Sequence, residues 1–137
     1  PLPEVTMSLQ FSTTLRNALL AAVESTIGTA PTLEIRTGAA PANCGTADSG
    51  TVLATMTLPS DWMAAASGGS KALAGTWEDL TADATGTAAH FRIKAGATCH
   101  MQGTCGMGSG DLQLDNTSIA TGQKVTITSF TLTAPGV

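Results

Sequence analysis

Charged side chains are scarce in this 137-residue sequence: they make up 12% of it, about half of the roughly 25% that is typical of soluble domains. Aromatic residues make up only 4%, and there is no tyrosine. The sequence therefore lacks the clustered basic face that nucleic acids require and has few rings on which bases or sugars can stack. It also has no run of about 18 apolar residues. We predict neither a direct nucleic-acid partner nor a membrane partner.

The shortage of charge also bears on how the protein works. A free monomer normally uses charged side chains to stay soluble and to protect the edges of its sheets. Here Thr, Ser, Ala and Gly must supply most of the surface. We interpret this as a sign that neighbouring molecules cover much of the outside, within a larger assembly. The alternative is a Thr-rich monomer that its hydroxyl groups keep in solution.

The N-terminal residues lack the basic and apolar stretches of a secretory signal peptide. The sequence begins Pro1-Leu2-Pro3, as expected when an initiator Met before a small residue is removed. We therefore expect synthesis in a cytoplasm. Residues 1–11 contain two prolines and no clear period, and we predict that they form an extended arm.

A helix is predicted over residues 12–27, because apolar residues recur there every four positions and so share one face. Ser12 or Thr13 can cap its first turn, and Gly28 can end it. The residues on the predicted apolar stripe are Leu15, Leu19, Val23 and Ile27.

From residue 31 onwards the pattern is typical of short strands separated by turns. Residues 32–37 and 88–94 alternate, so that Leu33, Ile35, Phe91 and Ile93 face one way and charged residues the other. The longest β signal lies near the C-terminus, where a break in alternation at Ser129-Phe130 predicts a β-bulge.

About seven to nine such strands, with no alternation of strands and helices, predict a mainly β fold of the β-sandwich or jelly-roll type with one N-terminal helix. The predicted organisation is an arm over residues 1–11 and a single domain over residues 12–137. The length of the chain is close to the commonest size of one domain.

The odd number of cysteines, Cys44, Cys99 and Cys105, is not typical of a disulfide framework. We predict that they are buried apolar thiols. A disulfide, between Cys99 and Cys105 or between Cys44 and either, is the alternative. A zinc site that includes His100 is disfavoured, because Cys99 and His100 would point to opposite faces of a strand. We predict no metal site and no cofactor.

No local catalytic motif is present. His90 and His100 lie on adjacent predicted strands, and a chance triad is conceivable, but there is no G-x-S-x-G or similar signature. The glycine-rich residues 106–110 lack the G-K-[ST] ending of a phosphate-binding loop. We predict that the protein is not an enzyme and has no catalytic residues.

Trp62 and Trp77 are the largest apolar side chains in a sequence with few aromatics. Either both belong to the core, or one is a hot spot of a contact surface, where Trp is enriched. We include both as candidate partner contacts. The arm supplies further candidates, because an extended segment can pair with a neighbouring sheet edge. These candidates are Pro1, Leu2, Pro3 and Val5.

Several stretches together form a recognisable series of motifs. They are LRNAL (15–19), TLEIRTG (32–38) with PAN (41–43), ATGTAAHFRI (84–93), DLQLDNTSI (111–119) and GQKVTITSFTL (122–132). The series resembles a widespread family of small virion proteins from tailed bacteriophages, of the capsid cement or decoration type. Family members often have Trp where His90 stands and lack the segment around residues 99–105, which puts any site there in doubt.

The resemblance implies a structural protein on the capsid surface of the virion. Such a protein would bind the outside of the shell, contact the major capsid protein and stabilise contacts between its subunits. The resemblance also implies self-association as a dimer. The alternatives are a structural component of the tail or baseplate, and a carbohydrate-binding module for attachment to a host.

Overall fold

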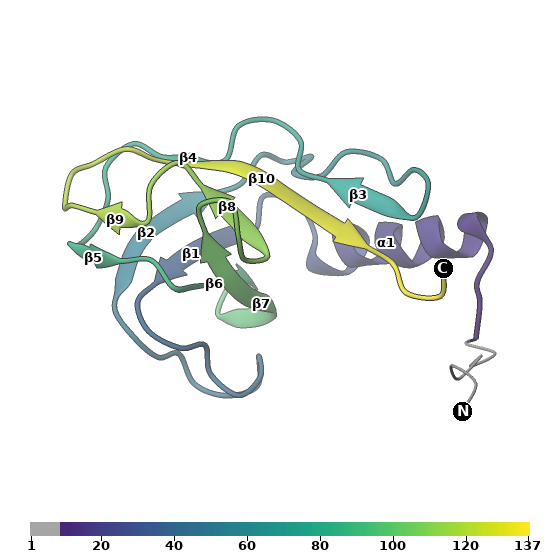
Figure 1. Cartoon of the computed structure of the whole chain (residues 1–137), viewed down its shortest axis with the longest axis horizontal. Helices are drawn as coiled ribbons and strands as arrows, with labels where there is room; N and C mark the ends of the chain where they lie inside the picture. The colour runs from purple at the N-terminus through teal and green to yellow at the C-terminus, as the bar shows by residue number, and fades with distance from the viewer. Residues whose placement is uncertain (1–8) are drawn as a thin grey trace, which may run out of the picture.

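The computed structural model describes residues 9–137. A helix precedes the strands in this part of the chain (Figure 1). The elements, in chain order, are α1 (Thr13–Ile27), β1 (Thr32–Arg36), β2 (Val52–Thr57), β3 (Ser70–Ala72), β4 (Glu78–Asp79), β5 (Gly86–Thr87), β6 (His90–Ala95), β7 (Thr98–Gly106), β8 (Leu112–Leu114), β9 (Ser118–Ile119) and β10 (Val125–Thr133).

The strands confirm the predicted fold class, a mainly β protein with one N-terminal helix. The main sheet has the strand order β2-β1-β6-β7-β8-β10-β3, with β4 also paired to β10, and it curls into a half-barrel (Figure 1). Its named pairs are antiparallel except for β7 and β8, which are parallel. Strands β5 and β9 form a small separate sheet.

The predicted helix is confirmed at both ends. The Ser12 hydroxyl accepts a hydrogen bond from the Leu15 backbone N–H at 3.1 Å, which caps the first turn. Gly28 ends the helix with a φ of 95°, and its N–H donates to the Glu24 carbonyl at 2.9 Å. A positive φ strains any residue that carries a Cβ, so glycine suits this position.

The predicted apolar stripe is only partly correct. Leu15 and Leu19 are 45% and 41% exposed, whereas the helix buries Arg16, Leu20 and Ile27. The first two turns are rotated by one residue relative to the prediction. The reason is that Arg16 reaches the end of β10, where its Nε and Nη2 donate to one backbone carbonyl at 3.2 and 2.9 Å.

The predicted β-bulge is present in β10. Ile127 pairs with Leu114 and Ser129 pairs with Gln113, so Thr128 is the extra residue. The bulge therefore lies just before the predicted position. It coincides with the point where β10 leaves its pairing with β4 and continues between β8 and β3.

Trp62 and Trp77 lie at the centre of the apolar core, with 0% and 1% of their surface exposed. Their rings are 5.9 Å apart, and the Trp77 ring is 5.5 Å from Phe130. Phe130 in turn contacts Phe91 edge-on at 5.6 Å. These four rings connect the two halves of the curled sheet through one continuous core.

The candidate role of Trp62 and Trp77 as partner contacts is therefore corrected: both are core residues. They can be fully buried because each indole N–H finds a backbone carbonyl without water. Trp62 donates to Gly28 at 2.9 Å, and Trp77 donates to Trp62 and Ala74 at 3.2 and 3.1 Å. The other candidate contacts lie outside the described residues: Pro1, Leu2, Pro3 and Val5.

Within residues 9–137, the structure has no helix of the length and apolarity needed to cross a membrane.

Candidate functional site

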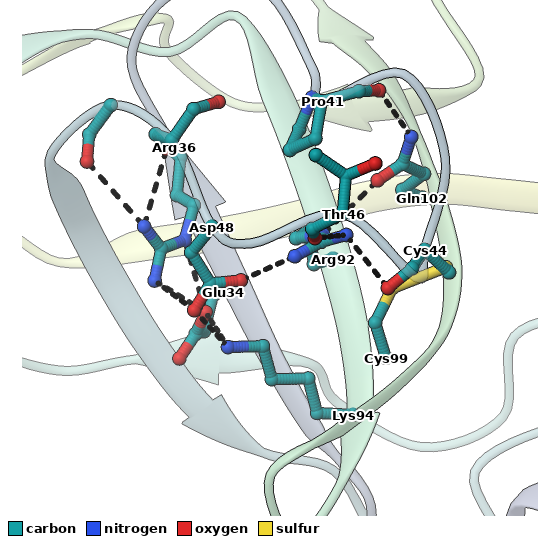
Figure 2. Close-up of polar contacts among 12 residues, drawn as sticks. Glu34, Arg36, Pro41, Cys44, Thr46, Asp48, Arg92, Lys94, Cys99 and Gln102 are labelled. Atoms are coloured by element: carbon teal, nitrogen blue, oxygen red, sulfur yellow. Dashed lines mark hydrogen bonds and ion pairs between the residues drawn. A yellow bond between two sulfur atoms is a disulfide. The ribbon is translucent and has the colours of Figure 1, made fainter.

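The most polar part of the interior is a set of ion pairs on the face of β1 and β6 that points away from the apolar core. The alternation of the two strands sends Leu33 and Ile93 into the core and the charged residues to this second face. The loop that follows β1, residues 37–51, folds over that face (Figure 2). We call this set the ion-pair cluster. Its members are Glu34, Arg36, Asp48, Arg92 and Lys94.

Arg92 occupies the middle of the cluster and is 2% exposed. Its Nε donates to the Gln102 side chain at 3.0 Å, and its Nη1 donates to Asp48 (Figure 2). Its Nη2 lies 3.0–3.2 Å from three backbone carbonyls of the covering loop, which a guanidinium can reach because its donors form a rigid fork. These carbonyls belong to Asn43, Cys44 and Thr46.

Asp48 is the acid that brings the cations together. One of its oxygens accepts from Lys94 at 2.6 Å and from Arg36 at 3.2 Å, and the other accepts from Arg92. The hydrogen bonds from Lys94 and then Arg92 lower the pKa of Asp48 from 3.8 to about 2. Asp48 is therefore ionised in the folded chain at neutral pH.

Glu34 completes the cluster from β1. Its carboxylate lies 2.9 Å from Arg36 and 3.0 Å from Lys94. Burial alone would lower the pKa of Lys94, but its hydrogen bonds to Asp48 and Glu34 outweigh that effect and raise it. Lys94 therefore stays charged, and each of the three cations of the cluster has a carboxylate partner.

A disulfide between Cys44 and Cys99 ties the same loop to β7 (Figure 2). The prediction of three buried thiols is therefore wrong for these two residues, and one of the alternative pairings is the correct one. The sequence could not choose among these pairings, because 55 positions separate Cys44 from Cys99. Cys105 is a free thiol, and burial raises its pKa to about 11, so it is a poor nucleophile at neutral pH.

Loss of the disulfide is expected to destabilise the fold by about 2–4 kcal/mol, because the cross-link closes a long loop in the unfolded chain. The variants are Cys44→Ser and Cys99→Ser, and urea denaturation with and without a reductant measures the loss. Cys105→Ser is the matched control, because it leaves the cross-link intact. Equal stability of the oxidised and reduced wild-type chain would contradict this prediction.

Acid is expected to weaken the ion-pair cluster. Asp48 has a lower pKa in the folded than in the unfolded chain, so between about pH 4 and pH 2 the unfolded chain binds more protons and stability falls as the pH falls. The contribution is complete above about pH 4. Urea denaturation between pH 7 and pH 2 measures this slope. Asp48→Asn should be less stable at pH 7 and should have a flatter slope; an unchanged slope would show that Asp48 is not responsible.

The two histidines do not form a catalytic arrangement. His90 is buried, and its Nδ1 lies 2.7 Å from the Gly38 carbonyl. Its Nε2 has no hydrogen-bond partner in the described part of the chain, so no carboxylate or nucleophile is paired with it there. His100 is exposed on β7. No group of three or more His, Cys, Asp or Glu side chains within residues 9–137 is placed to hold a metal ion.

The two buried cations outside the cluster, Arg16 and Lys71, hold α1 against the sheet. Arg16 joins the helix to the end of β10, as described above. Lys71 on β3 lies 2.9 Å from the Glu24 carboxylate of α1 and donates to the Ala64 carbonyl at 2.9 Å. Of the six Lys and Arg residues in the sequence, five are thus buried and only Lys124 is exposed. The buried ones are Arg16, Arg36, Lys71, Arg92 and Lys94.

The sequence did not reveal the ion-pair cluster, although a signal was present. Glu34 with Arg36 and Arg92 with Lys94 each alternate with apolar residues, and the sequence placed them on the face opposite the apolar residues without showing what covers that face. The structure buries them because the loop supplies Asp48 and a row of carbonyls that replace water. In a sequence with so few charges, two alternating charged pairs were the feature that could have indicated a buried network.

The fold and the site define a mainly β protein in which charges, a disulfide and an aromatic core hold loops in place around a curled sheet. The site is built as a scaffold, since each charged group in it is paired with another part of the chain. No protein-family model, curated protein or solved structure matches this chain.

Proposed function

We propose that the chain is a structural virion protein that binds the outer surface of a tailed-phage capsid and stabilises contacts between major capsid protein subunits. We also propose that it self-associates as a dimer on that surface. The proposal draws on the resemblance of the sequence to capsid cement proteins and on one structural observation, the burial of five of the six cations.

The burial of these cations leaves a surface with little charge of positive sign. Among the described residues, Lys124 is the one Lys or Arg with a largely exposed side chain, at 58%. Most of the outside consists of Thr, Ser, Ala and Gly. Placing such a surface against a neighbour costs less than desolvating ions, because hydroxyl groups can exchange water for a partner's hydrogen bonds.

The way the loops are held also supports a contact role. Arg92 and the Cys44–Cys99 disulfide fix the long loop after β1, and Arg16 and Lys71 fix the helix. A surface that is already rigid loses little conformational entropy when it binds, so a larger share of the contact energy remains as affinity. A protein that reinforces a shell under internal pressure benefits from rigid contact surfaces, because they lose little entropy on binding.

The test uses purified virions and shells from which the protein has been stripped. We expect the protein to be present in a fixed ratio to the major capsid protein, to appear on the head by cryo-electron microscopy, and to rebind stripped shells to saturation. Filled heads without it should burst at lower temperature and after milder osmotic shock, and the added protein should restore resistance. Stripped heads that resist both stresses as well as intact heads would contradict the proposal.

The position of the protein in the virion distinguishes the capsid role from a role in the tail or baseplate. Density for the protein on the tail or baseplate, with none on the shell, would replace the capsid role by a tail role. Sedimentation of the free protein tests self-association: a dimer is expected, and a monomer over the whole accessible concentration range would remove that part of the proposal. The carbohydrate-binding alternative has lost its candidate residues, because Trp62 and Trp77 are both buried.

A further inference from the structure

The loop after β1, residues 37–51, is held along its length by side chains of the sheet. His90 Nδ1 lies 2.7 Å from one of its carbonyls. Gln102 Nε2 donates to another at 2.7 Å, and Arg92 and Arg36 donate to the rest (Figure 2). These contacts do not involve a sulfur atom, so they do not require the Cys44–Cys99 bond. The carbonyls belong to Gly38, Pro41, Asn43, Cys44, Thr46 and Ser49.

Arg92 fixes the backbone at Cys44 itself. Its Nη2 donates to the Cys44 carbonyl at 3.2 Å and to a carbonyl on either side, that of Asn43 at 3.1 Å and that of Thr46 at 3.0 Å. Hydrogen bonds from a charged guanidinium are stronger than those between neutral groups, and Arg92 is largely shielded from water. The position of Cys44 therefore depends on Arg92 as well as on the disulfide.

A β-bulge aims Cys99 at the same loop. Met101 and Cys99 pair with two consecutive residues of β6, Ile93 and Lys94, so His100 is an extra residue in β7. A regular ladder would place His100 opposite Lys94 and turn Cys99 toward the core, whereas the extra residue reverses that alternation. Cys99 therefore lies on the face of the ion-pair cluster, under the loop.

The two cysteines are accessible to small thiols but not to Cys105. Cys44 and Cys99 are half-buried, and Gly45 and His100 beside them are exposed. Their Cα atoms are 5.2 Å apart. Cys105 lies six positions further along β7, or about 20 Å at about 3.3 Å per residue, which exceeds the roughly 7 Å limit for a disulfide. Since exposed disulfides are the ones that thiols reduce readily, this pair can open and close without a competing cysteine.

We propose that Cys44 and Cys99 form a reversible redox switch on the loop after β1, and that Arg92 is the residue that positions Cys44 for it. In the reduced form, the hydrogen bonds of Arg92 keep the loop over the ion-pair cluster and hold the two thiols near each other. In the oxidised form, the disulfide fixes the loop to β7 covalently. This proposal is independent of the capsid role, since it concerns the isolated chain.

The switch closes by thiol–disulfide exchange with a low-molecular-weight disulfide. The thiolate of one cysteine attacks a sulfur of that disulfide, forms a mixed disulfide and displaces one small thiolate. The thiolate of the other cysteine then attacks the protein sulfur of the mixed disulfide and displaces the second small thiolate. The two cysteines lose two electrons and two protons in total, and the small disulfide becomes two thiols. The reverse sequence opens the switch in a thiol-rich medium.

Equilibrium with glutathione tests the role of Arg92. The full-length protein is equilibrated, without oxygen, with graded ratios of glutathione disulfide to glutathione, and alkylation with mass spectrometry gives the cross-linked fraction. This fraction yields the effective concentration of the two thiols. We expect Arg92→Met to lower it about tenfold, within the roughly 5- to 150-fold range that is typical of coupled sites. A value within about twofold of the wild type would overturn the positioning role.

Lys71→Met is the matched control, because it removes a buried cation that holds α1 and not the loop. It should change the effective concentration by less than about twofold, as expected for distant sites. An equal decrease in Lys71→Met and Arg92→Met would overturn the assignment. If Arg92→Met does not fold, Gln102→Met decides: it removes the donor to Pro41 and the acceptor of Arg92 Nε. An unchanged equilibrium in that variant would overturn the proposal.

The reduced wild-type chain tests whether the pair is a switch or a condition of the fold. We expect its far-UV circular dichroism to match that of the oxidised chain. The Thr46 amide, which donates to the Asn43 carbonyl at 3.1 Å, should exchange at least about tenfold faster after reduction, as expected for a locally opened segment. The Leu33 amide, inside the β1 ladder, should not change. Unfolding on reduction, or equal exchange of Thr46 in both forms, would overturn the proposal.

Discussion

Replacing Arg92 with Met is expected to lower the free energy of unfolding by about 3–5 kcal/mol, which is a large part of the 5–15 kcal/mol that is typical of a domain. The substitution leaves one oxygen of Asp48 without its guanidinium partner and removes the donor to three loop carbonyls. The loop carbonyls that lose this part-buried donor retain their cost of desolvation. Urea denaturation followed by far-UV circular dichroism measures the change.

Lys124→Met is the matched control for the Arg92 variant. Lys124 is 58% exposed and pairs at 3.2 Å with Glu78 at the surface, and such a pair contributes about 0–1 kcal/mol. A second readout follows the loop itself: in Arg92→Met, the amides of residues 43–48 should exchange faster, whereas the amides of β10 should be affected less. A loss below about 1 kcal/mol would show that the loop is held without Arg92.

Replacing Trp77 with Ala is expected to cost about 3–5 kcal/mol, because it removes the largest possible volume from the centre of the core. Trp77 is 1% exposed and contacts both Trp62 and Phe130. Its loss leaves a cavity between the helix side and the sheet side of the core. Far-UV circular dichroism is the suitable probe, since the substitution also removes one of the two tryptophan fluorophores.

Trp77→Phe separates the packing of Trp77 from its hydrogen bonds. Phe keeps most of the apolar ring but leaves the carbonyls of Trp62 and Ala74 without the indole N–H that they share. We expect this variant to lose about 1–3 kcal/mol, clearly less than Trp77→Ala. If the two variants were equally destabilised, the hydrogen bonds would outweigh the packing. A small loss of stability in Trp77→Ala would contradict the buried position of Trp77 in the core.

The ion-pair cluster and the proposed capsid role are connected through the distribution of charge. A chain with few ionic groups could have spread them over its surface to remain soluble on its own. Instead, Arg92, Lys94 and Arg36 hold one loop, and Arg16 and Lys71 hold the helix. This arrangement makes the interior rigid at the cost of surface charge, which suits a protein that spends its functional life in contact with neighbours.

The sequence alone determined the local features of the fold. The four-residue spacing between residues 12 and 27, with Ser12 before it and Gly28 after it, predicted α1 to within one residue. The alternation in β1, β6 and β10 predicted these strands, and the break near Ser129 predicted the bulge. Such features depend on neighbours one to four positions away, and the pattern of side chains along the chain specifies them directly.

The tertiary structure decided the contacts between distant residues. The Cys44–Cys99 pairing, the convergence of Asp48 on Arg92 and Lys94, and the burial of Arg16 in place of Leu15 join segments that are tens of residues apart or depend on how the helix is rotated. Sequence patterns give the face on which a side chain lies but not what covers that face. Only the folded loop after β1 turned the charged face of these strands into a buried site, because its carbonyls and Asp48 took the place of water.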